Sequence, residues 1–287
     1  EGCFLKMRQL VLGNEAIARG AYEAGARVVA SYPGTPSTEM TEYISNYPEI
    51  YSEWAANEKV ALEVAVGASL GGARAMSCMK HVGVNVAADP LYTAAYTGVN
   101  AALVVVVADD PGMHSSQNEQ DSRFHARAAQ VPMLEPADSQ ECLWFTKLAF
   151  ELSERYDTPV MLRTTTRIAH ARSLTECGER LQVPVLQYVR DLKKNVMMPA
   201  MARARQLHVE TRMNRMAVDA CGWDINRAEM RDLKVGVVCS GIAYQYVREA
   251  LPEASVLKLG LVNPLPRALI ERFAAQVEKL YVIEELE

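Results

Sequence analysis

The stretch AALVVVVA, residues Ala101–Ala108, is a continuous run of small and β-branched apolar side chains. Such a run is typical of a strand in a parallel sheet that is covered on both faces. Strand-like runs also occur at Arg27–Ser31 and Arg74–Cys78 before it and at Pro159–Thr164 after it, with helical patterns between them. Strands that alternate with helices predict an α/β fold, which we expect to be a doubly wound parallel sheet.

A long polar segment, DDPGMHSSQNEQDSRFHARAAQ (Asp109–Gln130), follows this buried strand directly. It begins where the carboxyl end of a parallel strand is expected, and ligands of open α/β sheets bind outside those ends. Long loops in compact domains are usually functional. Its mixture of His, Gln, Asn and Arg differs from a simple solvated tail, so we expect the segment to border a ligand site.

The 287 residues are enough for two domains. The first helix–strand pattern extends over residues 1–180, and a stretch rich in Arg and Met over residues 181–232 predicts a helical connector whose basic side chains face solvent. A second α/β pattern follows over residues 233–287, with Ser255–Leu261 expected as one strand. Because this pattern stops after three strands, we expect the second domain to be incomplete.

Bulk composition excludes several classes of protein. Hydrophobic residues make up 49% and charged residues 23% of the chain, as in ordinary soluble proteins. The net charge of −5 indicates no nucleic-acid partner, and the apolar runs are too short to cross a membrane. The six cysteines form no CxxC pair, which argues against a local zinc or iron–sulfur site and suits a reducing cytoplasm. We give Glu1–Lys6 no weight in the fold.

One short motif points to a different chemistry. Gly67–Gly71 fits the GxSxG pattern of the nucleophile elbow in α/β hydrolases, with His114 or His125 as a possible partner of Ser69. That motif requires a strand directly before the serine, whereas the preceding residues have a helical pattern. A hydrolase is therefore the less favoured alternative, and small residues that let two helices pack closely explain the motif equally well. No GxG dinucleotide fingerprint, P-loop or HExxH motif is present.

Glu58 opens a predicted helix in which Glu63 is the only polar side chain between Val60 and Ala68. A helix that is apolar on all sides is buried, so a carboxylate at its start needs a partner. One interpretation is an ion pair with Lys59 or Arg74. The other is a proton exchanged with a ligand nitrogen, because burial raises a carboxyl pKa while a helix N-terminus lowers it. Both interpretations remain open from the residues alone.

Four stretches together carry a family resemblance: YPGTPSTEM (Tyr32–Met40), EWAANEKVALEVAVGASLGGARA (Glu53–Ala75), MKHVGVNVAADPL (Met79–Leu91) and ADDPGMHSSQNEQDSR (Ala108–Arg123). They resemble the alpha subunits of indolepyruvate ferredoxin oxidoreductases, which are thiamine diphosphate-dependent 2-oxoacid:ferredoxin oxidoreductases. Two later stretches resemble the family's second domain, SGIAYQYVREALPEASVLKLGLVNPLP (Ser240–Pro266) and LYVIEELE (Leu280–Glu287). The likeness covers nearly the whole chain from Leu10 onward.

The resemblance implies a fold and a set of site residues. The first domain is expected to bind the aminopyrimidine ring of thiamine diphosphate, and the second to resemble the C-terminal domain of transketolase. Glu58 matches the family's pyrimidine-activating glutamate, and Thr35 its threonine over the reacting centre, although Thr35-Pro36 also has the pattern of a helix cap followed by proline. The implied cofactor-binding residues are Pro33, Gly34, Thr35, Glu58, Gly83 and Asn85.

Substrate contacts are expected from a loop at Lys80–Gly83 and from the long polar segment. Pyruvate-specific relatives hold the substrate carboxylate with an arginine after the central strand, whereas this sequence has Asp109 and Asp110 there. Two acids would repel a carboxylate, so other groups must bind it and a large aryl substrate is expected. The implied substrate residues are Lys80, His81, His114, Gln117 and Asn118.

The resemblance also implies an activity, the oxidative decarboxylation of arylpyruvates such as indolepyruvate to aryl-acetyl-CoA with reduction of ferredoxin. Expected partners are the 2-oxoacid, coenzyme A, ferredoxin and a smaller second subunit in a dimer of heterodimers. The Gly-Asp motif that binds Mg²⁺ and the cysteine-rich segment that binds [4Fe-4S] clusters are missing. We therefore expect the front portion of a longer subunit, inactive alone and with no metal ligands of its own. A non-catalytic α/β module is the remaining alternative.

Overall fold

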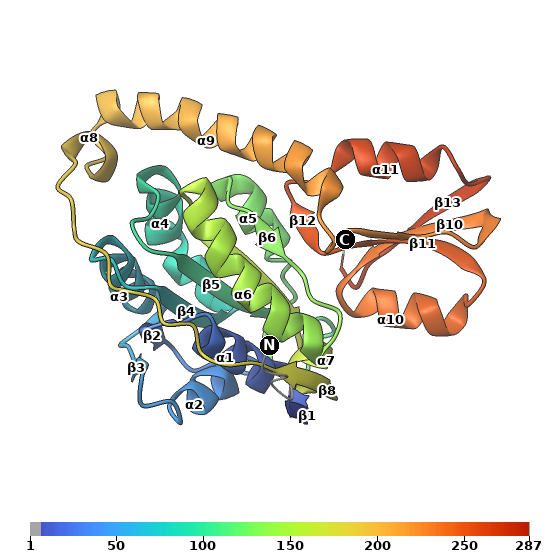
Figure 1. Ribbon diagram of the computed structural model, residues 1–287, viewed down its shortest axis with the longest axis horizontal. Coiled ribbons are helices and arrows are strands. Elements are labelled where there is room, and N and C mark those ends of the chain that lie inside the picture. Colours follow the sequence, from blue (N-terminus) through green and yellow to red (C-terminus); the bar gives the residue numbers. More distant parts are fainter. Residues whose placement is uncertain (1–6, 287) are drawn as a thin grey trace, which may run out of the picture.

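The computed structural model describes residues 7–286 and shows two α/β units joined by a long helix (Figure 1). The first unit contains β1 (Met7–Leu12), α1 (Gly13–Glu23), β2 (Val28–Ser31), α2 (Thr38–Ile44), β3 (Tyr51–Trp54), α3 (Glu58–Leu70), β4 (Ala75–Lys80), α4 (His81–Thr97), β5 (Leu103–Asp109), α5 (Arg123–Ala129), β6 (Met133–Leu134), α6 (Ser139–Tyr156), β7 (Val160–Thr165), α7 (Thr166–His170) and β8 (Arg172–Cys177).

The remaining elements are α8 (Leu192–Asn195), α9 (Pro199–Asp219), the 3₁₀ turn η1 (Ala220–Gly222), β9 (Arg227–Glu229), β10 (Asp232–Ser240), α10 (Gly241–Ala250), β11 (Ala254–Leu259), β12 (Leu261–Asn263), α11 (Arg267–Ala274) and β13 (Lys279–Ile283). The predicted α/β class is confirmed by a seven-stranded sheet, in the order β12-β6-β7-β5-β4-β2-β3, and a four-stranded sheet, in the order β13-β10-β11-β9.

The central strand β5 explains why the first sheet is covered on both faces. Every residue of β5 is buried, and it pairs in parallel with β4 and β7. Val104 and Val106 pack in one apolar cluster with α1, α2 and α6, whereas Val105 and Val107 pack in a second cluster with α3 and α4. Alternate side chains of one strand thus fill the two cores of a doubly wound sheet.

Several predicted boundaries near the carboxyl edge of this sheet are wrong. The helix expected to start at Thr35-Pro36 starts at Thr38, after a cis Thr35-Pro36 peptide. The helix α4 begins at His81, directly after the last residue of β4. The Lys80–Gly83 stretch is therefore the end of β4 and the first turn of α4 rather than a loop. The last part of the predicted polar loop forms α5.

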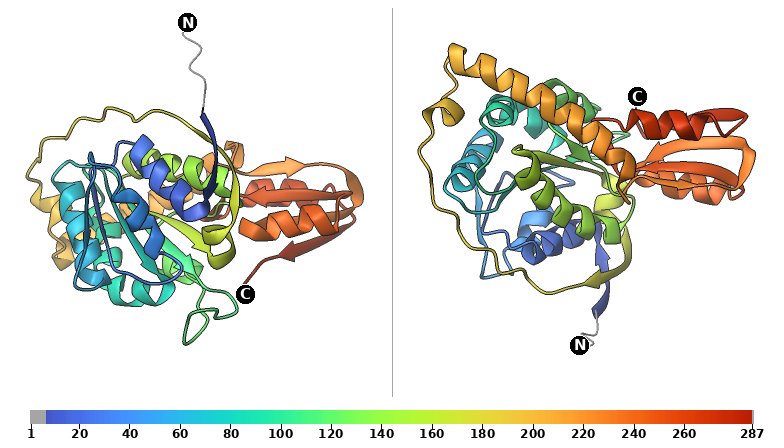
Figure 2. Two further views of the ribbon diagram at one scale, coloured as in Figure 1. Left: turned by 90° about the horizontal axis from the view of Figure 1, so that it is seen from below. Right: turned by 45° about the horizontal axis from the view of Figure 1, so that its top comes forward.

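The connector crosses the first unit twice. After β8, which pairs antiparallel with β1, residues 178–191 run in an extended path along the outside of the first unit to α8 (Figures 1 and 2). The helix α9 then returns along the opposite side to the second unit (Figure 1). Asp157 anchors this return: its carboxylate accepts hydrogen bonds from Lys194 Nζ at 2.8 Å, Arg205 Nη2 at 3.0 Å and the backbone N of Val99 at 2.9 Å.

The second unit is interlocked with the first. The predicted strand Ser255–Leu261 is divided at Gly260, and β12 leaves to pair antiparallel with β6 of the seven-stranded sheet. The strand β9 lies inside the predicted connector but pairs with β11. The predicted boundaries at residues 180 and 232 remain predictions. Within residues 7–286, no helix is long and apolar enough to cross a membrane.

We predict that Asp157→Asn loosens the connector. Asparagine keeps the left-handed backbone conformation of this position, at φ 52°, but removes the charge that pairs with Lys194 and Arg205. Breaking a half-buried pair of this kind should lower the free energy of urea unfolding by about 2–3 kcal/mol. Hydrogen exchange should increase in α8 and α9. Asp224→Asn, at an exposed residue whose side chain makes no hydrogen bond or ion pair within residues 7–286, should change neither measurement; equal effects would contradict this role of Asp157.

Candidate active site

The carboxylate of Glu58 is partly buried and unpaired. Asn57 caps α3 by accepting a hydrogen bond from the backbone N of Val60 at 3.0 Å, which places Glu58 as the first helical residue. Lys59 pairs with Asp89 at 2.9 Å and Arg74 with Glu154 at 2.6 Å, so the ion-pair interpretation of Glu58 is wrong. Among the described residues, no side chain or backbone group binds the Glu58 carboxylate.

Gly83 makes room for this carboxylate. A Cβ at Gly83 would lie 2.7 Å from both Cγ and Oε1 of Glu58, closer than any real side chain permits. Gly83 is buried in the first turn of α4, where free backbone N–H groups and the helix dipole favour a negative charge. The sequence positions Glu58 through two helix starts, those of α3 and α4, that lie side by side at the carboxyl edge of the sheet.

The helix α3 is buried on one face only. Ala61, Leu62, Ala65 and Ser69 point into the core, whereas Val60 is 38% exposed and a Cβ at Gly67 would meet no atom within 4 Å. The expectation of a helix buried on all sides is therefore wrong for this chain. The outer side of α3 therefore exposes Val60 and Gly67 together with the charged Lys59 and Glu63.

Ser69 is not a nucleophile. It lies within α3 rather than on a strand-to-helix elbow, it is buried, and its Oγ donates a hydrogen bond to the backbone O of Ala101 at 2.5 Å. The hydroxyl ties the helix to the chain before β5 and has no access to a substrate. The hydrolase alternative is wrong on this geometry.

The turn after β2 approaches the end of β4. A Cβ at Gly34 would lie 3.1 Å from Cβ of Lys80, so a larger residue at position 34 would press on the Lys80 side chain. Pro33 and Thr35 are exposed next to this contact. Thr35 does not cap α2, because the N-cap residue is Ser37, whose hydroxyl donates to the backbone O of Gly34 at 2.7 Å. Thr35 is thus free to face a ligand.

The polar loop, residues 110–122, lies over the end of β4 and the start of α4. Lys80 Nζ donates to the backbone O of Ser115 at 2.5 Å, and His81 Nε2 lies 3.3 Å from the backbone O of Asn118. Asn85 Nδ2 donates to Oε1 of Gln120 at 3.0 Å. His81 is fully buried, and its Nδ1 has no hydrogen-bond partner among the described residues. Predicted cofactor and substrate residues therefore meet at one place.

Two of the predicted substrate residues lie apart from this cluster. His114 and Gln117 are exposed on the outer part of the polar loop, and neither side chain makes a hydrogen bond within residues 7–286. The side chain of Asn118 is exposed too, and accepts a hydrogen bond from Gln120 Nε2 at 2.9 Å. The assignment of these residues to the substrate remains a prediction.

Asp109 and Asp110 fold the loop rather than face a ligand. Asp109 is buried and accepts hydrogen bonds from Arg163 Nε at 2.7 Å and Ser122 Oγ at 2.5 Å. Burial alone would raise the pKa of Asp110, but hydrogen bonds from Ser116, Ser115, Thr166 and His114 lower that pKa to about 2. Both acids are thus engaged by partners among the described residues, and the expectation that they repel a substrate carboxylate remains a prediction.

Sequence reasoning missed Arg163, the centre of a buried ionic cluster. Its guanidinium is 1% exposed and binds Asp109 and, through Nη1, Oε1 of Glu135 at 2.5 Å. Burial disfavours the cation, but the surrounding carboxylates outweigh it and raise the pKa of Arg163. Glu135 in turn accepts a hydrogen bond from Ser240 Oγ of the second unit at 3.0 Å. The signal was a lone arginine in the apolar strand VMLRTT.

No group of three or more His, Cys, Asp or Glu side chains within residues 7–286 could hold a metal ion. The site thus offers one unpaired carboxylate, a buried histidine, a lysine and two glycine contacts at the carboxyl ends of β2, β4 and β5. This is where open parallel sheets bind ligands.

Residues 19–230 match the family described as "Pyruvate flavodoxin/ferredoxin oxidoreductase, thiamine diP-bdg". The chain belongs to this family, which confirms the relationship expected from the sequence. Among individual proteins, it is 44% identical to the indolepyruvate oxidoreductase subunit IorA of Archaeoglobus fulgidus and 46% identical to that of Methanothermobacter thermautotrophicus. Each match covers 96% of this chain and 46% of the relative, so the chain spans about half the length of these relatives.

Solved structures share the fold. The 2-oxoglutarate:ferredoxin oxidoreductase from Magnetococcus marinus, with 2-oxoglutarate, coenzyme A and succinyl-CoA bound, superposes with a TM-score of 0.83 at 18% identity, over 96% of this chain and 58% of that one. An inactive split-gene transketolase gives a TM-score of 0.58 at 15% identity, over 96% of this chain and 79% of that one. The predicted doubly wound fold is confirmed.

We predict that Asp110→Asn loosens the polar loop. The Asp110 pKa of about 2 lies below its ordinary value of 3.8, so the ionised carboxylate adds about 2 kcal/mol of stability. This contribution is present above pH about 4 and is lost as the pH falls towards 2. At pH 7 the variant should lose it, and hydrogen exchange in residues 110–122 should increase. Glu119→Gln, which affects one loop hydrogen bond to Gly112, should cost less; a larger cost would contradict the proposed role of Asp110.

Proposed function

We propose that this chain supplies the pyrimidine-binding half of a thiamine diphosphate site. The observation that carries the proposal is the Glu58 carboxylate, which has no partner of its own and lies in a space that only a glycine at position 83 leaves open. A half-buried carboxylate without a partner is costly unless a ligand satisfies it. The family to which the chain belongs is described as thiamine diphosphate-binding, which supports the same assignment.

The residues present fit the cofactor's aminopyrimidine ring. Glu58 would hold a ring nitrogen and exchange a proton with it, while Gly83 keeps the carboxylate in place. Pro33, Gly34 and Thr35, in the turn after β2, would border the thiazolium ring next to the aminopyrimidine. Asn85 holds the polar loop over the site through its hydrogen bond to Gln120. When bound, thiamine diphosphate supplies the carbon nucleophile and the electron sink that decarboxylation requires. The protein's part is to orient, to exclude water and to move one proton.

Substrate binding falls to groups beneath the polar loop. Lys80 presents an ammonium that already donates to the Ser115 carbonyl, and His81 keeps a buried Nδ1 that no described residue binds. An ammonium and an imidazole suit a 2-oxoacid carboxylate, one as a point charge and the other as a hydrogen-bond donor. The exposed His114, Gln117 and Asn118 would reach the substrate only if the outer loop closes over it.

The second half of the site would come from a separate domain. Among the described residues, α3 and α4 leave apolar side chains exposed beside Glu58, including Val60 and Val86. A domain packed there would bind the cofactor's diphosphate group and its Mg²⁺, since no metal-binding cluster occurs within residues 7–286. The [4Fe-4S] clusters that accept electrons would also lie outside these residues.

For the whole enzyme we propose the oxidative decarboxylation of arylpyruvates, with indolepyruvate as the reference substrate, to aryl-acetyl-CoA. The support is the similarity to proteins named indolepyruvate oxidoreductase subunit IorA, and that name implies at least one further subunit. Coenzyme A and ferredoxin are the expected co-substrates, as in the related 2-oxoglutarate enzyme. A dimer of heterodimers and a cytoplasmic location complete the proposal.

Glu58→Gln should abolish the proton exchange while leaving the shape of the site. In the assembled enzyme we expect exchange of the cofactor's C2 proton, measured by NMR, to slow by about 10²–10⁴-fold, the usual contribution of a general acid–base group. Glu63→Gln is the matched control, because Glu63 lies on the same helix with its side chain 52% exposed. An unchanged exchange rate in Glu58→Gln would refute the role and would favour the non-catalytic α/β module.

Substrate preference tests the Lys80 and His81 assignment. An indole ring gains several kcal/mol from apolar burial that pyruvate lacks, so kcat/KM should strongly favour indolepyruvate. Lys80→Ala and His81→Ala should each raise KM by about 10-fold or more, because each removes a group that binds the carboxylate. Lys59→Ala, on the exposed side of α3, is the control for loss of a lysine. Equal kcat/KM values for the two substrates, or indifference to both substitutions, would disprove the assignment.

A further inference from the structure

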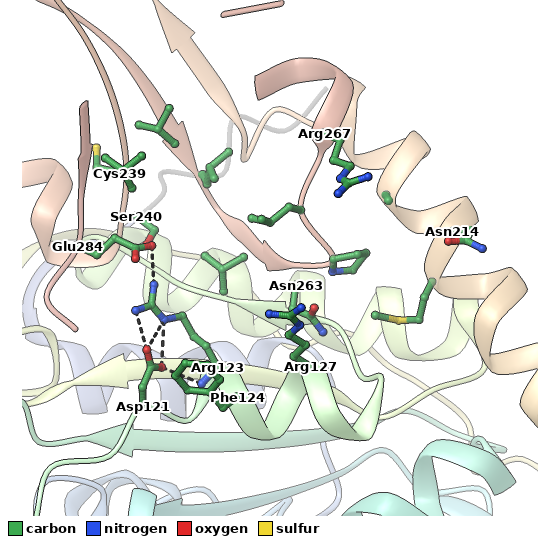
Figure 3. Close-up of a pocket in the computed structure, with 18 residues that line it drawn as sticks. Asp121, Arg123, Phe124, Arg127, Asn214, Cys239, Ser240, Asn263, Arg267 and Glu284 are labelled. Carbon is green, nitrogen blue, oxygen red and sulfur yellow. Dashed lines mark hydrogen bonds and ion pairs between the residues drawn. The ribbon is translucent and has the colours of Figure 1, made fainter. Parts of the chain in front are cut away.

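A groove of about 580 Å³ separates the two units, away from Glu58. Its first wall is formed by α5 and α9, and its second by the carboxyl ends of β10, β11 and β13 together with the segment leading into α11 (Figure 3). The volume lies within the range of about 300–1,000 Å³ typical of small-molecule sites. None of the residues assigned above to thiamine diphosphate or to the 2-oxoacid lines it.

The topology of the second sheet places a ligand crevice at this position. The chain passes from β10 through α10 to β11 on one side, and later through α11 to β13 on the other side of β10. Helices α10 and α11 consequently cover opposite faces of the sheet, in separate apolar clusters. The strand order therefore reverses at β10, and open parallel sheets bind ligands at the carboxyl end of such a switch point. Ser240, the last residue of β10, lines the groove.

Two uncompensated cations face this groove. Arg127 on α5 and Arg267 at the start of α11 are both exposed, and neither guanidinium has a hydrogen-bond or ion-pair partner within residues 7–286. Figure 3 shows them pointing towards one another from opposite sides of the groove. Arg123, by contrast, is satisfied by Asp121 and by Glu284 at 2.6 Å. The lining therefore carries three arginines and two acids, a net charge of +1, and both acids pair with Arg123.

A planar apolar surface lies on the same wall as Arg127. The Phe124 side chain is 61% exposed, which is unusual for an aromatic ring on a helix and leaves a face for stacking. Val262, Pro264 and Leu265 supply further apolar lining from the segment before α11. The groove thus combines a ring-binding surface with two anion-binding groups.

The N-terminus of α10 is not available to the anion. Glu135 from the first unit already occupies it: Oε2 accepts a hydrogen bond from Ser240 Oγ at 3.0 Å, and a Cβ at Gly241 would lie 2.6 Å from Oε1. This carboxylate takes the position that a phosphate commonly takes at a helix N-terminus. An anionic ligand in the groove must therefore be held by Arg127 and Arg267.

From these observations we propose that the groove binds a nucleoside diphosphate moiety, with the base stacked on Phe124 and the diphosphate between Arg127 and Arg267. A diphosphate has enough negative charge to satisfy two arginines, and each guanidinium can bind phosphate oxygens in a bidentate manner. The moiety is either a free nucleotide or the ADP portion of coenzyme A. Both sources carry the same recognised chemistry.

Binding of the fluorescent analogue mant-ADP to the protein tests the proposal by anisotropy, with unlabelled competitors. ADP should displace the probe, whereas adenosine and inorganic pyrophosphate should each compete at least 10-fold more weakly. Arg127→Gln and Arg267→Gln should each weaken binding by about 10-fold or more, and Phe124→Leu by about 5-fold or more. Coenzyme A distinguishes the sources: displacement at lower concentration than ADP assigns the site to the coenzyme, and weaker displacement assigns it to a free nucleotide.

Matched variants separate this site from general charge effects. Arg203→Gln removes an exposed arginine of α9 outside the groove, and Tyr188→Leu removes an exposed ring of the extended connector; neither should change the affinity. Three results would overturn the proposal: no binding of mant-ADP, equal weakening by Arg203→Gln, or displacement by pyrophosphate or indolepyruvate as effective as by ADP. Circular dichroism of each variant shows whether it is folded.

Discussion

The buried guanidinium of Arg163 needs carboxylates to balance its charge. The placement of the polar loop and of the second unit depends on this constraint. Arg163 projects from the central part of the first sheet into the protein interior, where an unpaired charge costs several kcal/mol. Asp109 comes from the neighbouring strand and Glu135 from the segment after β6. Because Glu135 also binds Ser240, one ionic cluster ties the sheet, the loop and the second unit together.

Glu58, in contrast to Arg163, is a charged side chain without a partner among the described residues. Its neighbours Lys59 and Arg74 are occupied elsewhere, and the adjacent Gly83 leaves room for the carboxylate without binding it. Two carboxylates bind the buried Arg163, whereas among the described residues nothing binds the Glu58 carboxylate beside the two helix starts. An unpaired, half-buried carboxylate is unfavourable for stability and is expected mainly at functional sites. This one lies at the carboxyl edge of the sheet, where ligands bind.

The two units are joined more closely than a helical connector alone would join them. Strand β12 leaves the second unit to pair with β6 of the first sheet, and Arg123 on α5 binds Glu284 just beyond β13. These contacts hold the switch point of the second sheet against α5 and α9, so the groove between the units has walls from both. A site built in this way exists only in the joined structure.

The sequence by itself determined the α/β class, the central buried strand at Ala101–Ala108 and the position of Glu58 at a helix start, because these depend on local periodicity and capping. Only the tertiary structure decided which charges are paired. Asp109 and Asp110 looked like free acids and are satisfied, whereas Glu58, for which the sequence left an ion pair open, has no partner among the described residues. Pairing joins residues far apart in the chain, and no local pattern records it.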